Sequence, residues 1–169
     1  MIHLDSCTSP LGHITLAADE NALLGLWFDG QKHYLRGLPE EWQEGENKIT
    51  SEAKRWLKAY FNGENPPVTL PLNPNGSCFA QSVYTALLEI PYGKTMTYGE
   101  LAVRVMGTEQ GRRYARSVGT AVGRNPISIM IPCHRILGVN RSLTGYAGGI
   151  ERKRALLELE CTLYSMLLR

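Results

Sequence analysis

The 169-residue sequence has no long apolar run, no closely paired cysteines and little net charge. No apolar stretch approaches the roughly 20 residues of a membrane-spanning helix, and no basic-then-apolar signal segment opens the chain. No C-x-x-C pair occurs among its four cysteines, which argues against a zinc ribbon. These absences predict a cytoplasmic protein with no membrane segment, no bound metal and no structural disulfides.

The net charge of +2 is divided unevenly along the chain. Residues 1–75 contain 6 lysines and arginines against 10 aspartates and glutamates, a net charge of −4. Residues 76–169 contain 12 against 6, a net charge of +6. This asymmetry favours a polyanion as the partner of the second half, although two unlike surfaces without a partner would show the same charges.

The first half has the pattern of a small α/β domain. Three short apolar segments separated by turn residues predict an antiparallel meander of strands over residues 2–7, 13–18 and 22–28. Apolar residues at helical spacing predict a helix from Ser51 to Phe61, whose aromatic side chains we expect in the core. Residues 62–77 hold four of the nine prolines and predict a linker. We therefore expect domains at 1–75 and 76–169.

The second half has the pattern of a mainly helical domain. Ser77 is a predicted N-cap, and Thr97 with Glu100 forms a predicted capping box. A short helix to Met106, a glycine-bearing turn and a helix over residues 112–122 predict a helix-turn-helix. Three arginines of the second helix suit contact with DNA, although paired short helices are also common in proteins that do not bind DNA.

The stretch from Asn125 to Arg135 combines an apolar run with reactive side chains. Residues 127–131 have the length and β-branched content of a buried strand, which Pro132 would end. Cys133 and His134 follow directly. A free thiol is mostly protonated near neutral pH, so a nucleophilic cysteine needs a base, and a histidine base needs a carboxylate to orient it. A lone cysteine is more often a small core residue.

The sequence around Cys133 resembles the O6-alkylguanine-DNA alkyltransferase family (methylated-DNA–protein-cysteine methyltransferase). The resemblance covers roughly residues 79–160 and rests on motifs that occur in the same order: Phe79-Ala80-Gln81-Ser82-Val83-Tyr84, Pro91-Tyr92-Gly93, Thr97-Tyr98-Gly99-Glu100-Leu101-Ala102, Ala115-Arg116-Ser117-Val118-Gly119, Asn125-Pro126, Pro132-Cys133-His134-Arg135 and Gly145-Tyr146-Ala147-Gly148-Gly149. It implies an α+β protein with a ribonuclease-H-like N-terminal domain and a winged-helix-like C-terminal domain containing the helix-turn-helix.

The resemblance implies DNA repair by one irreversible transfer of the alkyl group from O6-alkylguanine to Cys133, without a cofactor or metal. His134 and Glu160 would activate the thiol, and Asn125 would brace the turn before it. Duplex DNA containing the alkylated guanine would be the partner of a monomer, and the damaged base would be flipped out of the stack. The resemblance leaves open whether O4-alkylthymine is also repaired.

The same resemblance implies further contacts with the base and the DNA. Arg116 would fill the space of the flipped base, and Arg135 belongs with the substrate- or DNA-binding residues. The backbone carbonyls of Cys133 and Ile136 would accept from the guanine amine, and Tyr98 would donate toward a ring nitrogen. Tyr146 and the N–H of Ala147 would line the pocket near O6; Ala147 stands where several relatives have serine. Residues 106–114 look a few residues longer than in many relatives, so we expect the turn of the helix-turn-helix, and with it the DNA footprint, to differ from theirs.

Three other functions remain open at this point. A thiol hydrolase could use the same Cys133, His134 and Glu160, but it would need an oxyanion hole and would turn over. A lesion-flagging relative would have tryptophan in place of Cys133. A transcriptional regulator could use the helix-turn-helix alone, although in this chain that motif lies inside the predicted catalytic domain.

Overall fold

The structure is a computed structural model that describes residues 1–160. The chain folds into two compact units. The first contains Met1–Asn75 and the short segment Pro126–Ser128, and the second contains Gly76–Asn125 and the chain from Ile129 onward. The chain therefore leaves the second unit after Asn125, contributes three residues to the first and returns at Ile129. Together the units give the predicted α+β architecture.

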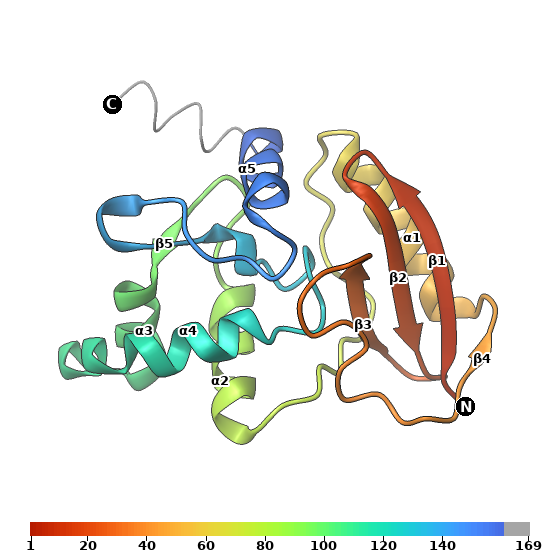
Figure 1. The fold of residues 1–169 in the computed structure, drawn as a ribbon, viewed down its shortest axis with the longest axis horizontal. Coiled ribbons are helices and arrows are strands. Elements are labelled where there is room, and N and C mark those ends of the chain that lie inside the picture. The colour runs from red at the N-terminus through yellow and green to blue at the C-terminus, as the bar shows by residue number, and fades with distance from the viewer. Residues whose placement is uncertain (161–169) are drawn as a thin grey trace. The chain divides into compact units, whose positions relative to one another are not determined.

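The sheet of the first unit confirms the predicted meander. Three antiparallel strands follow one another: β1 His3–Ser9, β2 Gly12–Ala18 and β3 Leu23–Phe28 (Figure 1). Ile14 and Leu16 of β2 lie opposite Phe28 and Leu26 of β3, and all four are fully buried. A fourth strand, β4 Gln43–Glu44, pairs parallel with β1. It was missed because two exposed polar residues have no strand pattern.

The helix α1 Lys48–Phe61 packs against this sheet. It begins before the predicted Ser51 because Asn47 caps it: the Asn47 side chain accepts from Thr50 N, and the Thr50 hydroxyl accepts from Asn47 N. Tyr60 is 1% exposed and stacks on Trp56 with a centroid separation of 5.2 Å. The expectation that these aromatic residues pack in the core is confirmed for Tyr60.

The outer edge of β3 is paired with two segments that the sequence did not mark as strands. Leu23 donates to Pro71 O and accepts from Asn73 N, at 2.9 and 2.8 Å. Leu26 donates to Pro126 O and accepts from Ser128 N, at 2.8 and 3.0 Å. The predicted linker is thus partly fixed to the sheet. These bonds satisfy backbone groups that an open edge strand would leave exposed.

The helices of the second unit begin where the capping signals predict. Ser77 caps α2 Cys78–Leu88, and Thr97 with Glu100 forms the predicted capping box of α3 Tyr98–Met106. The unit also contains the helix α5 Ile150–Leu159. A short parallel pair, β5 Met96–Thr97 and β6 Ile136–Leu137, lies in the same unit.

The second helix of the helix-turn-helix differs from the prediction. Instead of one helix over residues 112–122, a 3₁₀ helix, η1 Glu109–Tyr114, precedes α4 Ala115–Gly123. Gly111 lies in η1 against α3; a Cβ there would be 2.6 Å from Met106 Cβ and 2.9 Å from Ala102 O. Arg112 and Arg113 therefore lie on η1, and Arg116 lies in the first turn of α4.

The strand predicted over residues 127–131 is wrong. Only Ile127 forms a bridge, to Leu26, and residues 128–130 form a turn, although the whole stretch is buried. The Asn125 side chain donates to Ile131 O at 2.9 Å across this turn. Ile129 has φ +69°, which is a strained conformation for a β-branched residue. The apolar content predicted the burial correctly. The backbone forms a turn instead of a strand, and the Asn125 side chain bridges this turn.

Within residues 1–160, no helix combines the length and the apolar character needed to cross a bilayer. The apolar sequence of residues 162–169 predicts that this tail packs against the protein, but these residues lie outside the described part of the chain.

Candidate active site

Cys133 begins a short 3₁₀ helix, η2 Cys133–Arg135, directly after Pro132. Its backbone N–H donates to Ile131 O at 2.7 Å, and its side chain is buried, since the residue is 5% exposed. Asn125, two residues after the end of α4, braces the turn before Cys133 through Ile131 O and also hydrogen-bonds the thiol. The thiol is therefore held by a backbone turn and an amide rather than by the end of a strand.

His134 and Arg135 converge on one carboxylate. His134 Nε2 lies 2.5 Å from Glu160 Oε2, and both side chains are fully buried. Arg135 Nε donates to Glu160 Oε1 at 2.7 Å, while its Nη1 donates to Ile90 O at 2.6 Å. Its guanidinium also lies over the Tyr92 ring, 5.8 Å from the centroid. Arg135 thus contacts the carboxylate that orients His134.

The ionisation of this cluster follows from burial and from its hydrogen bonds. Burial favours the neutral acid of Glu160, but the hydrogen bonds from His134 and Arg135 and the charge of Arg135 prevail and lower its pKa from 4.5 to about 2. Burial lowers the pKa of His134 below 6.5, against the opposing effect of Glu160. Burial raises the pKa of the Cys133 thiol, against the hydrogen bond of Asn125. At rest the site therefore holds a thiol, a neutral imidazole and a carboxylate.

The hydrogen-bond pattern fixes which imidazole nitrogen is basic. A carboxylate can only accept a hydrogen bond, so His134 Nε2 carries the imidazole proton and donates the hydrogen bond to Glu160. Nδ1 is then unprotonated, and among the described residues it has no hydrogen-bond partner although it is buried. Nδ1 is therefore the basic nitrogen of this imidazole.

Lys153 also belongs to this site, although no motif points to it. It is fully buried on α5, and its ammonium donates to Thr144 O at 2.8 Å, to Gly145 O at 3.0 Å and to Ile136 O. Burial lowers its pKa to about 8, and the thiolate of Cys133 opposes this effect. Helical spacing does indicate that Lys153 is buried. It lies three, four and seven residues before Leu156, Leu157 and Glu160, so it shares their buried face of the helix.

The remaining predicted residues fall into two groups. Tyr98 begins α3, and its hydroxyl would lie 3.4 Å from a Cβ at Gly145. Burial raises the pKa of Tyr98, and the charge of Cys133 adds to this. Tyr146 and Ala147 are half-buried in the loop before α5, whereas Arg116 is exposed on α4. The structure thus groups Tyr98 with the loop near Cys133 and leaves Arg116 at the surface.

The site has no cluster suited to a metal. Among residues 1–160, no three histidine, cysteine, aspartate or glutamate side chains lie together in a way that could hold a metal ion.

The buried cluster predicts a loss of stability in acid. As pH falls below about 6.5, His134 becomes protonated in the unfolded chain but stays neutral in the folded chain, which lowers the stability of the fold. Between pH 4.5 and about 2, Glu160 is likewise protonated in the unfolded chain but ionised in the folded chain. The carboxylate alone corresponds to about 3 kcal/mol over the full interval, of which about 2 kcal/mol is lost by pH 3. Urea unfolding followed by circular dichroism from pH 7 to pH 3 measures this loss, which should be clearly smaller in Glu160→Gln. Equal pH slopes in both proteins would contradict the assignment.

Comparison with known proteins gives matches over most of the chain. The model of the 6-O-methylguanine DNA methyltransferase ribonuclease-like domain matches residues 2–74, and that of the DNA binding domain of the same name matches residues 78–162. The methylated-DNA–protein-cysteine methyltransferase of Methanosarcina acetivorans is 45% identical over 152 residues, which is 90% of this chain and 94% of that protein. The protein of that name from Haemophilus influenzae is 42% identical, over 90% and 82% of the two chains.

A solved structure is similar over the same range. The crystal structure of Mycobacterium tuberculosis OGT in complex with DNA aligns with a TM-score of 0.82 and 42% identity, covering 94% of this chain and 92% of that one.

Proposed function

The chain belongs to the 6-O-methylguanine DNA methyltransferase family, and we propose that Cys133 is the residue on which it accepts the alkyl group. Its function is DNA repair by direct transfer of the alkyl group from O6-alkylguanine in DNA to a cysteine. The observation that carries the assignment to Cys133 is the buried thiol followed directly by a neutral imidazole that a carboxylate orients.

The transfer is a single displacement. His134 Nδ1 takes the thiol proton through one water molecule, because no protein group within residues 1–160 lies within hydrogen-bond distance of Nδ1, and the thiolate sulfur attacks the alkyl carbon. The carbon–sulfur bond forms as the bond from that carbon to guanine O6 breaks, and the electron pair passes to the base. A proton donated by the Tyr98 hydroxyl neutralises the leaving base, and the proton held by His134 restores the tyrosine through solvent. The thioether is stable, so each molecule acts once.

Positioning residues surround this reaction. Arg135 and Glu160 hold the imidazole, and Asn125 fixes the turn that presents the sulfur. The Lys153 ammonium donates hydrogen bonds to the carbonyls of Ile136, Thr144 and Gly145. These bonds would hold in place the two segments that we propose line the base pocket. Tyr146, Ala147 and the carbonyls of Cys133 and Ile136 would contact the guanine.

The proposed DNA surface is the helix-turn-helix. Arg112 and Arg113 are exposed on η1, where they can contact phosphates of duplex DNA, and Arg116 is exposed on α4. Arg116 would occupy the space that the flipped alkylguanine leaves. We propose that the protein acts as a monomer in the cytoplasm, where a reducing environment keeps Cys133 free.

A titration tests this function. Increasing amounts of a short duplex containing one O6-methylguanine are added to the protein, and the modified base that remains is measured by chromatography after nuclease digestion. We expect repair to stop at one lesion per protein molecule. Continued turnover would favour a thiol hydrolase, and lesion-selective binding without loss of the methyl group would favour a lesion-flagging protein.

A further inference from the structure

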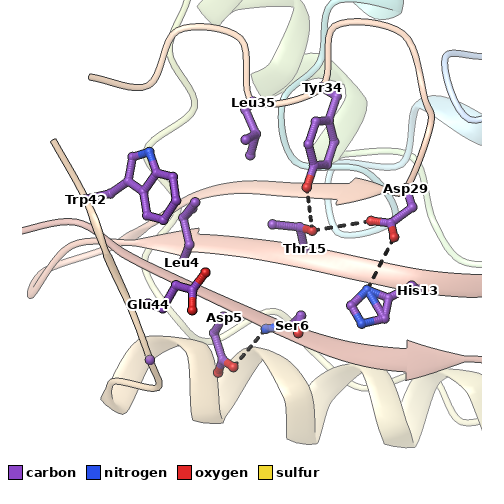
Figure 2. Close-up of a pocket in the computed structure, with 11 residues that line it drawn as sticks. Leu4, Asp5, Ser6, His13, Thr15, Asp29, Tyr34, Leu35, Trp42 and Glu44 are labelled. Atoms are coloured by element: carbon purple, nitrogen blue, oxygen red, sulfur yellow. Dashed lines mark hydrogen bonds and ion pairs between the residues drawn. The ribbon is translucent and has the colours of Figure 1, made fainter. Parts of the chain in front are cut away.

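A hollow lies on the sheet of the first unit. Its volume is about 640 Å³, within the range of small-molecule sites. β1 and β2 contribute to it, together with the chain that follows β3 (Figure 2). It is formed entirely by residues of the first unit and contains none of the residues assigned to alkyl transfer.

The hollow has two similar ends. Figure 2 shows Trp42 and Glu44 at one end and Tyr34 and Asp29 at the other, so that each end combines an aromatic ring with a carboxylate. Both aromatic residues are 42% exposed. Leu4 and Leu35 add apolar surface. No lysine or arginine lines the hollow, but two of its carboxylates have basic neighbours: Asp5 lies 2.7 Å from Lys54 Nζ, and Asp29 lies 3.5 Å from His13 Nδ1.

One wall is fixed before any ligand arrives. The Tyr34 hydroxyl lies 2.9 Å from the Thr15 hydroxyl, and the Tyr34 ring meets the buried Trp27 ring edge-on with a centroid separation of 6.2 Å. Thr15 also donates to Asp29 at 3.5 Å. Side chains that are already ordered lose less conformational entropy when a ligand binds.

We propose that this hollow binds a linear aliphatic polyamine. Each ammonium group would meet a carboxylate and an aromatic face, and both attract a cation. The methylene chain between the two ammonium groups would lie on Leu4 and Leu35. A single cation would satisfy one end only, and an anion would meet two carboxylates. The net charge of −4 on residues 1–75 also favours a cationic ligand over an anionic one.

The test uses the full chain at low salt, because exposed charge pairs are screened by salt. Spermidine and 1,4-diaminobutane are titrated while the indole N–H signal of Trp42 is followed by NMR. n-Butylamine and 1,4-butanediol serve as matched probes with one and no positive charge. We expect both polyamines to shift the Trp42 signal saturably, and n-butylamine to bind at least about threefold more weakly.

Variants locate the site. Asp29→Asn and Glu44→Gln should each weaken spermidine binding about threefold to fivefold, and Trp42→Leu, followed by calorimetry, should weaken it about twofold to fivefold. Glu20→Gln and Glu64→Gln remove the same charge from exposed positions outside the hollow and should change binding less than about twofold. Circular dichroism checks that each variant is folded.

Three results would overturn the proposal. They are an unchanged Trp42 signal at millimolar polyamine, equal affinity for n-butylamine, and equal weakening by the control variants, which would indicate diffuse attraction to a negative surface. None of these readouts depends on alkyl transfer.

Discussion

Replacing Cys133 with serine is expected to abolish alkyl transfer while leaving the affinity for DNA with an alkylated guanine nearly unchanged. The nucleophile is a thiolate, and a serine hydroxyl is a much weaker nucleophile at neutral pH. The two side chains have similar shapes, so the buried turn held by Asn125 should persist. A duplex labelled on the O6-methyl group measures transfer to protein, and a gel-shift titration measures binding.

The matched control for this variant is Cys78→Ser. Cys78 is an exposed cysteine on α2, outside the proposed site. The Cys78→Ser protein should accept the label at the wild-type rate and to the same extent. Label on Cys133→Ser protein, or a loss of labelling in Cys78→Ser, would place the acceptor elsewhere.

Replacing Glu160 with glutamine is expected to slow alkyl transfer by about 10²-fold or more, in line with the contribution of general base catalysis. A neutral amide cannot hold His134 as a carboxylate does, and its one oxygen cannot serve both His134 and Arg135. Arg135 would also lose its counter-ion in a nearly buried position, since its side chain is 11% exposed. Leaving such a charge unpaired costs about 3 kcal/mol of folding stability.

Two measurements separate these effects. Rapid-quench, single-turnover kinetics at saturating duplex give the transfer rate, at a temperature where circular dichroism shows the variant folded. Urea unfolding gives the stability. Glu158→Gln removes an exposed carboxylate of the same helix and should leave both values near wild type. A folded Glu160→Gln protein that transfers at the wild-type rate would exclude Glu160 from the mechanism.

Local signals in the sequence predicted much of the fold. Helix starts at Ser77 and Thr97 were predicted because a capping side chain and its backbone partner are only three residues apart. The meander was predicted because its strands are joined by short turns. Burial around Ile127 was predicted because apolar content is itself local information.

Features that depend on distant partners were not predicted. The apolar run over residues 127–131 alone suggested a strand. The turn at residues 128–130 is instead held by the Asn125 side chain and by pairing with β3, and neither partner can be recognised from the run itself. Arg135 lies against Glu160, 25 residues away, and a basic residue in a DNA-binding domain gives no sign of such an internal partner. Lys153 was overlooked because a lysine normally lies at the surface, and its three carbonyl partners are brought together only by the folded chain.

The most direct test of the account is the mass of the protein after it reacts with a short duplex containing O6-methylguanine, followed by peptide mapping. We predict a gain of one CH₂ group per molecule, located on the peptide that contains Cys133. An unchanged mass, or a methyl group on a peptide that contains Cys7, Cys78 or Cys161 instead, would contradict the assignment of Cys133 as the acceptor.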